Sequence, residues 1–225
     1  MRLIKELLLC VWMRKDIVYA KKLYILLIIG AVLFGISLLF VEPTMSDNQE
    51  NTKKAIFAGG CFWCMEGPFE KLDGVSAVIS GYTGGTEDNP TYEQVARGQT
   101  SHAEAVEVTY DPSKLSYDQL LDVFWMSINP TQKDGQFADI GKQYRTGIFY
   151  IDEEQKQLAE ASKAKFEAKN VFDGPIVTEI TEATEFFPAE EYHQDYYKKN
   201  PTHYKMYRYG SGREPYLKKL WGDQK

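Results

Sequence analysis

The chain places two of its three cysteines three residues apart, directly after an apolar run and a pair of glycines. The stretch reads Gly59-Gly60-Cys61-Phe62-Trp63-Cys64, and the apolar run before it is 55–58. A strand that ends in Gly-Gly and leads into a helix puts Cys61 at the helix N-terminus, where unpaired N–H groups and the helix dipole favour a thiolate. Cys64 then lies one turn further on the same face, within reach of a disulfide. We therefore predict a reactive thiol with its own resolving partner.

A run of 19 uncharged residues, 23–41, lies near the N-terminus. As a helix it would extend about 28 Å, close to the hydrocarbon thickness of a bilayer. Six basic residues against two acidic ones occupy 1–22, and this asymmetry predicts a cytoplasmic N-terminus and an extracytoplasmic domain. We expect an uncleaved single-pass transmembrane anchor rather than a cleaved signal peptide, because no small-x-small pattern follows the run.

The rest of the chain is expected to form a tether, 42–52, and one catalytic domain, 53–225. The aromatic content is high, with 15 Tyr, 12 Phe and 4 Trp, which suits either an aromatic-lined pocket or an ordinary core. The net charge is −6 although the first 22 residues are basic. The domain is therefore acidic and lacks the excess of basic residues that is typical of proteins that bind nucleic acid.

Strand and helix patterns alternate along this domain. Strands are predicted over 54–58, 75–82, 104–110, 144–151 and 177–180, and helices over 62–72, 92–97, 117–128, 153–170 and 189–198. The segment 129–143 is expected to be a long loop, and 204–225 a surface segment without regular structure. This mixed order favours an α+β or α/β two-layer sandwich.

Further motifs follow the cysteine pair in a fixed order. They are Gly81-Tyr82-Thr83-Gly84-Gly85, Asn89-Pro90-Thr91-Tyr92, His102-Ala103-Glu104-Ala105-Val106, Asp139-Ile140-Gly141-Lys142-Gln143-Tyr144-Arg145 and Ala189-Glu190-Glu191-Tyr192-His193-Gln194-Asp195-Tyr196. Together they resemble the peptide methionine sulfoxide reductase A family over about 53–201. The resemblance implies an α+β two-layer sandwich with a mixed sheet and flanking helices, and a catalytic cysteine at the start of a helix.

Reduction of a sulfoxide by thiols requires a thiolate, an acid and a second thiol. On the resemblance, Cys61 is the nucleophile, which releases methionine and becomes a sulfenic acid. Many family members have Gly in place of Cys64 and resolve with cysteines near the C-terminus, but no cysteine follows Cys64 here. Either Cys64 condenses with the sulfenic acid to form a disulfide, or an external thiol attacks directly.

Glu104 is the candidate acid. It shares strand parity with Val106, Val108 and Tyr110, so it should point to the apolar face, where burial would raise its pKa. The alternative is a carboxylate at the strand end that reaches water. The strand pattern leaves both open, and the resemblance makes this residue the proton donor.

The resemblance also assigns the substrate-binding residues. Phe62 and Trp63 correspond to the aromatic pocket for the substrate methyl group, although ordinary core packing is the alternative for both. Tyr92 and Tyr144 correspond to two tyrosines that hold the sulfoxide oxygen with uncharged hydroxyl donors. Asp139 corresponds to an aspartate tied either to the pocket or to reductant docking.

Three other functions compete with this interpretation. A thioredoxin-like disulfide oxidoreductase would use the same C-x-x-C but leaves Glu104 and the tyrosines unexplained. A structural zinc site could combine Cys61 and Cys64 with His102 and His193, although zinc ligands usually come as two close pairs. The domain could also merely bind a partner outside the cell.

We expect a membrane-anchored peptide-methionine (S)-S-oxide reductase that repairs oxidised proteins and also reduces free methionine sulfoxide. The preference for the S epimer follows from the resemblance alone. A thioredoxin-like protein is the expected reductant. No metal or organic cofactor is implied, and we expect a monomer.

Overall fold

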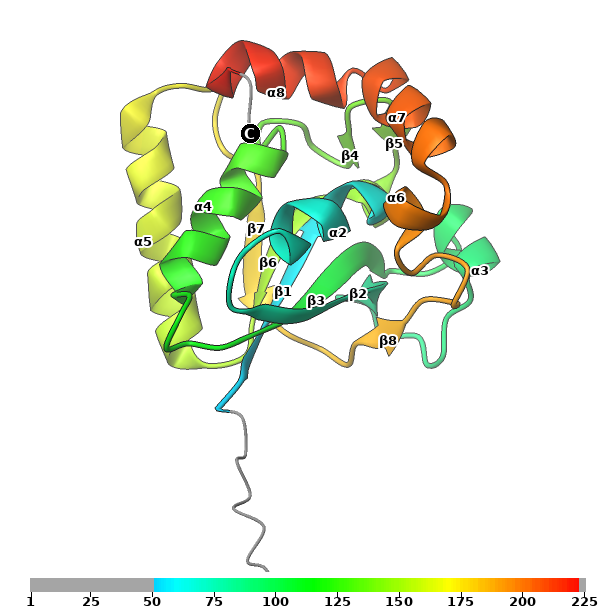
Figure 1. The fold of residues 1–225 in the computed structure, drawn as a ribbon, viewed down its shortest axis with the longest axis horizontal. Helices are drawn as coiled ribbons and strands as arrows, with labels where there is room; N and C mark the ends of the chain where they lie inside the picture. Colours follow the sequence, from blue (N-terminus) through cyan, green and yellow to red (C-terminus); the bar gives the residue numbers. More distant parts are fainter. Residues whose placement is uncertain (1–50, 223–225) are drawn as a thin grey trace, which may run out of the picture. The chain divides into compact units, whose positions relative to one another are not determined.

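The computed structural model describes residues 51–222, and a six-stranded sheet lies at its centre (Figure 1). The strands are β1 Lys53–Gly59, β2 Val75–Thr83, β3 Ala103–Tyr110, β6 Thr146–Tyr150, β7 Glu179–Glu182 and β8 Phe187–Pro188. Their order in the sheet is β7-β6-β1-β3-β2-β8. Neighbouring strands are antiparallel except β6 and β7, which are parallel, so the sheet is mixed as predicted.

Three helices cover one face of this sheet and form the main core with it. They are α2 Trp63–Glu70, α4 Tyr117–Ser127 and α5 Glu153–Lys169, and Figure 1 shows α2 and α4 in front of the strands. Phe57 of β1 stacks between Phe69 of α2 and Phe124 of α4, with ring centroids 5.1 and 5.2 Å away. The opposite face carries a smaller apolar cluster against which Phe186 packs. The helices and the sheet therefore form the predicted α+β arrangement.

Most predicted elements are present, but the connections contain more structure than the sequence pattern indicated. The expected loop 129–143 contains a hairpin of β4, Gly135–Gln136, and β5, Asp139–Ile140. It is followed by the 3-10 turn η1, Lys142–Tyr144, so β6 starts later than predicted. The short α3, Tyr92–Ala96, follows β2.

The C-terminal third differs most from the sequence prediction. The expected helix 189–198 is mainly a series of turns that ends in the short α6, Tyr196–Lys199. The expected irregular tail forms two helices, α7 Pro201–Gly210 and α8 Arg213–Trp221. Both helices are polar on average and lie mainly at the surface: α7 has no fully buried residue, and α8 buries only Arg213 and Leu217. Such polar segments resemble irregular surface chain in the sequence.

The fold prediction also placed one transmembrane helix ahead of the domain, and this part is corrected. Within residues 51–222, none of the helices has the length and apolar character needed to cross a bilayer. The predicted span, 23–41, lies outside the described residues.

Candidate active site

The turn between β1 and α2 carries two cysteines. Gly60 has φ +80°, a left-handed conformation that turns the chain from the strand toward the helix. Cys61 follows directly, two residues before Trp63, the first residue of α2. Cys64 lies in the first helical turn, and its N–H donates to the carbonyl of Cys61 at 3.0 Å. The two cysteines thus lie at the start of one helix, as the spacing predicted.

Both cysteines are free thiols and both are buried. The side chain of Cys61 is 7% exposed, whereas that of Cys64 is fully covered. The two side chains are hydrogen-bonded, with the Cys61 thiol donating to the sulfur of Cys64. An attacking or leaving group therefore has access only to Cys61 in this conformation.

The two cysteines influence each other's ionisation. Burial raises the pKa of Cys61, and the hydrogen bond to Cys64 and the charge of Glu104 raise it further. The pKa of Cys64 is lowered to about 6, because Cys64 accepts that hydrogen bond and faces Arg213 and Arg208.

Glu104 lies in β3, opposite Tyr82 of β2, and its side chain is buried. Its Oε2 accepts the backbone N–H of Phe62 at 3.1 Å, so the carboxyl group occupies one free donor at the start of α2. Burial raises its pKa to about 8, although the Phe62 N–H opposes this shift. At neutral pH most Glu104 side chains are therefore protonated and can donate a proton.

The two aromatic residues between the cysteines point to different surroundings. Phe62 is buried, and its ring lies 6.0 Å from Tyr82 and 5.1 Å from His193. Trp63 is half-buried; its ring stacks on Tyr196 at 3.7 Å, and its indole N–H donates to Nδ1 of His193 at 3.1 Å. His193 thus connects both aromatic residues.

The remaining predicted residues surround the same thiol pair. Burial raises the pKa of Tyr92 to about 12 and also raises that of Tyr144. The nearby charges of Glu104 and Cys61 raise both pKa values further. Tyr92 packs on His193 at 4.2 Å. Asp139 accepts a hydrogen bond from Tyr207, and burial raises its pKa. All eight residues singled out from the sequence lie in this one region.

Sequence reasoning overlooked the contribution of the C-terminal helices. The hydroxyl of Tyr207, on α7, bonds to Asp139 and also reaches the sulfur of Cys61. Arg208 donates to the carbonyl of Cys64 at 3.4 Å, and Arg213 of α8 donates to the carbonyl of Gly59 at 2.7 Å. The only signal in the sequence was the spacing of tyrosines and arginines along 204–213, which has the period of a helix but no apolar face.

Glu190 was also overlooked as a bridge between the tyrosines. Its two carboxylate oxygens accept the hydroxyl of Tyr82 at 2.8 Å and the backbone N–H of Tyr92 at 3.0 Å. It therefore fixes the position of α3 relative to β2.

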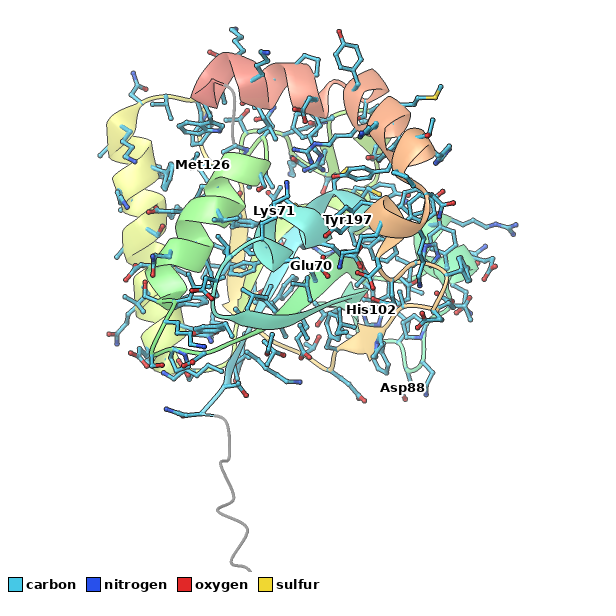
Figure 2. The ribbon with its side chains drawn as sticks, viewed as in Figure 1. Glu70, Lys71, Asp88, His102, Met126 and Tyr197 are labelled. Atoms are coloured by element: carbon cyan, nitrogen blue, oxygen red, sulfur yellow. The ribbon has the colours of Figure 1, made fainter. Side chains whose placement is uncertain are left out.

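The four residues of the alternative zinc site do not come together. Nε2 of His102 bonds to the carbonyl of Glu87 at 2.7 Å, and its ring packs edge-on against Phe187 of β8 (Figure 2). His193 uses Nδ1 to accept from Trp63. Throughout residues 51–222, no three His, Cys, Asp or Glu side chains are arranged to hold a metal ion.

Two buried, hydrogen-bonded thiols beside a largely protonated carboxyl group define a thiol-dependent oxidoreductase site. The family model described as peptide methionine sulfoxide reductase matches residues 53–225. The chain belongs to this family, as its motifs predicted, and it has the family's enzyme activity.

Several named relatives support this assignment. The peptide methionine sulfoxide reductase MsrA of Bacillus licheniformis is 53% identical over 173 residues, which cover 77% of this chain and 96% of the relative. The enzyme of the same name from Bacillus subtilis is 51% identical over 174 residues, or 77% of this chain and 98% of the relative.

Solved structures show the same fold. Mxr1 from Saccharomyces cerevisiae in its reduced form is 33% identical, with a TM-score of 0.64 over 69% of this chain and 88% of its own. Methionine sulfoxide reductase A of Corynebacterium diphtheriae is 35% identical, with a TM-score of 0.61 over 68% of this chain and 77% of its own.

The predicted localisation is corrected together with the transmembrane helix. It placed the chain in a membrane through 23–41 with an extracytoplasmic domain. None of the helices over 51–222 can span a bilayer, and the family match begins only at residue 53.

Proposed function

We propose that this enzyme reduces methionine-(S)-sulfoxide, in proteins and as the free amino acid, through Cys61 and Cys64. A thioredoxin-like dithiol then restores the two thiols. The observation that carries this mechanism is the contact between the Cys61 thiol and Cys64 next to the buried carboxyl of Glu104. The preference for the S epimer rests on family membership.

In the first step the sulfur of Cys61 attacks the sulfoxide. The S–O bond of the sulfoxide breaks and an S–O bond forms on Cys61, so the thiol and the sulfoxide become a sulfenic acid and a thioether. The sulfur of Cys61 is oxidised and that of methionine is reduced, and the proton lost by the Cys61 thiol replaces the one that Glu104 gives to the oxygen. Glu104 supplies the proton to the sulfoxide oxygen, since its pKa of about 8 keeps the carboxyl protonated at neutral pH. Tyr92 and Tyr144 hold this oxygen with neutral hydroxyls, because their raised pKa values keep them protonated.

The methyl group of the substrate would lie against the aromatic rings of this site. Phe62 offers a buried apolar surface, whereas Trp63 is half-buried and fixed by its bond to His193. Asp139 lies at the side of the site formed by the β4–β5 hairpin, where Tyr207 holds its carboxyl group. Its role is in the pocket rather than in an isolated docking patch.

In the second step Cys64 attacks the sulfur of the Cys61 sulfenic acid. A disulfide forms, the S–O bond breaks, and the oxygen leaves as water after taking up a proton. The domain has no other cysteine that could take this role. The external dithiol reduces the disulfide by exchange, and attack on Cys61 is favoured because Cys64 is fully covered.

A single-turnover assay tests the reaction. Reduced protein is mixed separately with the S and R epimers of a methionine sulfoxide peptide, and methionine and remaining thiols are counted. We expect about one methionine per enzyme from the S epimer only, with loss of both Cys61 and Cys64 thiols. Absence of methionine from either epimer, with both thiols retained, would refute the proposal.

The resolving role of Cys64 is tested with Cys64→Ser. The variant should still release about one methionine per enzyme in one turnover, but should cycle slowly with thioredoxin because no disulfide can form. Cys61→Ser is the matched variant, and it should release none. Unchanged thioredoxin-driven turnover of Cys64→Ser would show that an external thiol resolves the sulfenic acid instead.

A further inference from the structure

Tyr144 lies between two side chains that bind other parts of the chain. It is the last residue of the 3-10 turn η1, with Gln143 before it and Arg145 after it. Gln143 is 8% exposed and the side chain of Arg145 is 13% exposed, although both residue types usually lie at the surface. Buried polar groups are normally held by hydrogen bonds. The partners of these two side chains therefore show which elements they connect to η1.

Arg145 connects several segments through its guanidinium. Nη1 donates to the carbonyl of Ser101 at 3.2 Å and to that of Lys142 at 3.0 Å, and Nη2 donates to the carbonyl of Gly84 at 3.0 Å. Nε donates to Glu179 of β7 at 3.2 Å. The planar fork of a guanidinium holds such partners in fixed directions, whereas the ammonium group of a lysine does not.

The carbonyl partners of Arg145 lie at the ends of elements that form the site. Ser101 lies two residues before β3, which carries Glu104, and Gly84 directly follows β2, the neighbour of β3 in the sheet. The remaining carbonyl belongs to the first residue of η1 itself, and η1 packs against β3. Arg145 therefore fixes the turn that carries Tyr144 relative to the strand that carries Glu104.

The backbone at Gly84 leaves room for this contact. A Cβ at this position would lie 2.9 Å from Nη2 of Arg145 and 2.5 Å from the ring of Phe149, and the backbone is left-handed, with φ +73°. A larger residue would therefore push the guanidinium away from the carbonyl that it binds.

Gln143 connects η1 to the helix that carries Tyr92. Its Nε2 donates to the carbonyl of Ala96, the last residue of α3, at 3.0 Å. α3 begins with Tyr92, whose N–H is held by Glu190 at 3.0 Å. The residues on both sides of Tyr144 thus bind elements that carry another group of the site.

We propose that Gln143 and Arg145 are positioning residues that hold the Tyr144 hydroxyl in place for the sulfoxide oxygen. Both side chains bind backbone carbonyls rather than substrate atoms, so they act through Tyr144. The inference therefore rests on the oxygen-binding role of Tyr144 in the proposed function. A donor stabilises charge that develops on an oxygen best when it is already aimed at that oxygen. A displacement of about 1 Å in such a group can cost much of the rate.

A double-mutant cycle tests whether Arg145 acts through Tyr144. Arg145→Lys keeps a positive charge near Glu179 but loses the fork that binds the carbonyls, and it is made in wild type and in Tyr144→Phe. The single-turnover rate of methionine formation is measured over a range of peptide sulfoxide concentrations. Glu179→Gln is the matched control, because it removes the charged partner of Arg145 and leaves the carbonyl contacts.

We expect Tyr144→Phe to slow methionine formation about tenfold, as for a lost hydrogen bond to a charged group, and Arg145→Lys to slow it about three- to tenfold. In the Tyr144→Phe background, Arg145→Lys should change the rate less than about twofold, because the hydroxyl that it positions is already absent. The half-saturating peptide concentration should stay the same, since an interaction made in the transition state affects the maximal rate. Glu179→Gln should keep the wild-type rate.

The pH profile separates an effect on Tyr144 from damage to the proton donor. The rate is expected to fall at high pH, where the carboxyl of Glu104 ionises. Arg145→Lys should retain this fall, because Glu104 keeps its own contact with the N–H of Phe62.

Gln143→Met tests the other side of Tyr144. It removes the donor to Ala96 at nearly constant side-chain volume, and it should slow methionine formation in wild type but not in Tyr144→Phe. This variant decides the question if Arg145→Lys does not remain folded by circular dichroism.

Equal slowing by Arg145→Lys in both backgrounds, or wild-type rates in the folded Arg145→Lys and Gln143→Met proteins, overturns the inference. Loss of the pH dependence in Arg145→Lys would show that Arg145 acts through Glu104 and would overturn it as well. Failure of the proposed function is distinct from these outcomes: wild type would then form no methionine from either epimer, or Tyr144→Phe would be as fast as wild type.

Discussion

Glu104 combines two roles that are usually separate. It accepts the N–H of Phe62 at the start of α2, and its buried carboxyl is protonated through neutral pH. A helix N-terminus ordinarily stabilises a carboxylate, but here burial outweighs that stabilisation. The same contact thus fixes the position of the acid and keeps its proton available.

We expect Glu104→Gln to slow methionine formation about 100-fold or more, the usual contribution of a general acid. In wild type the single-turnover rate should be constant below pH 8 and fall above it, because the pKa of Glu104 is about 8. The variant should lose this dependence. Alkylation of Cys61 by iodoacetamide serves as the control and should persist. A variant as fast as wild type would mean that the proton comes from another group.

Tyr207 offers a second test at the level of single atoms. Its hydroxyl donates to Asp139 and also lowers the pKa of Cys61, and its one hydrogen can serve only one of the two groups at a time. Tyr207→Phe removes this donor from Cys61 when the sulfur becomes negative, so methionine formation should slow about tenfold, as for a lost hydrogen bond to a charged group. Tyr209→Phe, on the exposed side of the same helix, should leave the single-turnover rate unchanged. Equal rates for both variants would exclude a contribution of the Tyr207 hydroxyl.

Among the elements, the β1–α2 turn tolerates the least change. A Cβ on Gly60 would lie 2.4 Å from Cβ of Gln136 and 2.9 Å from Nη2 of Arg213, and the backbone is left-handed there. Gly60→Ala should therefore lower the free energy of unfolding by about 1–3 kcal/mol. Gly210→Ala, where a Cβ would meet no atom within 4 Å, should be neutral or slightly stabilising. Urea denaturation of both proteins measures the difference, and similar midpoints would contradict the steric argument.

The elements also show where sequence patterns carried the prediction and where they failed. The alternation along β3 placed Glu104 on the helix-covered face, and α4 begins directly after Ser116, an N-cap residue that forms a capping box with Gln119. Such local signals depend on residues close in sequence. Arg213 gave no such signal, because its partners Gly59 and Ser127 are 154 and 86 residues away. Polar contacts between residues so far apart along the chain produce no periodic pattern in the sequence.

At the scale of the whole molecule, buried carboxyl groups make stability depend on pH. Glu66 is 1% exposed; its Oε1 accepts from Ser80 and from the N–H of Asp195, while its Oε2 has no partner among residues 51–222. Burial raises its pKa from 4.5 to about 7. The folded state therefore favours the protonated form, and the stability it provides below pH 4.5 is lost as the pH rises to 7.

Glu66→Gln isolates this contribution, because a Gln carbonyl can accept the same two hydrogen bonds and does not titrate. Between pH 5 and 7 the stability of wild type relative to the variant should fall by at most about 1.4 kcal/mol per pH unit. Urea denaturation at several pH values measures this difference. A difference that does not vary with pH would mean that Glu66 is ionised in the folded protein throughout.

The anchoring of Arg213 on the carbonyl of Gly59 also has a consequence for how the protein is made. The cysteines are among the first residues of the domain to emerge from a ribosome, whereas the guanidinium on the neighbouring Gly59 carbonyl belongs to α8. Folding during synthesis proceeds from the N-terminal side. The cysteines are therefore synthesised well before the cation beside them, and they gain this neighbour only after α8 has been made.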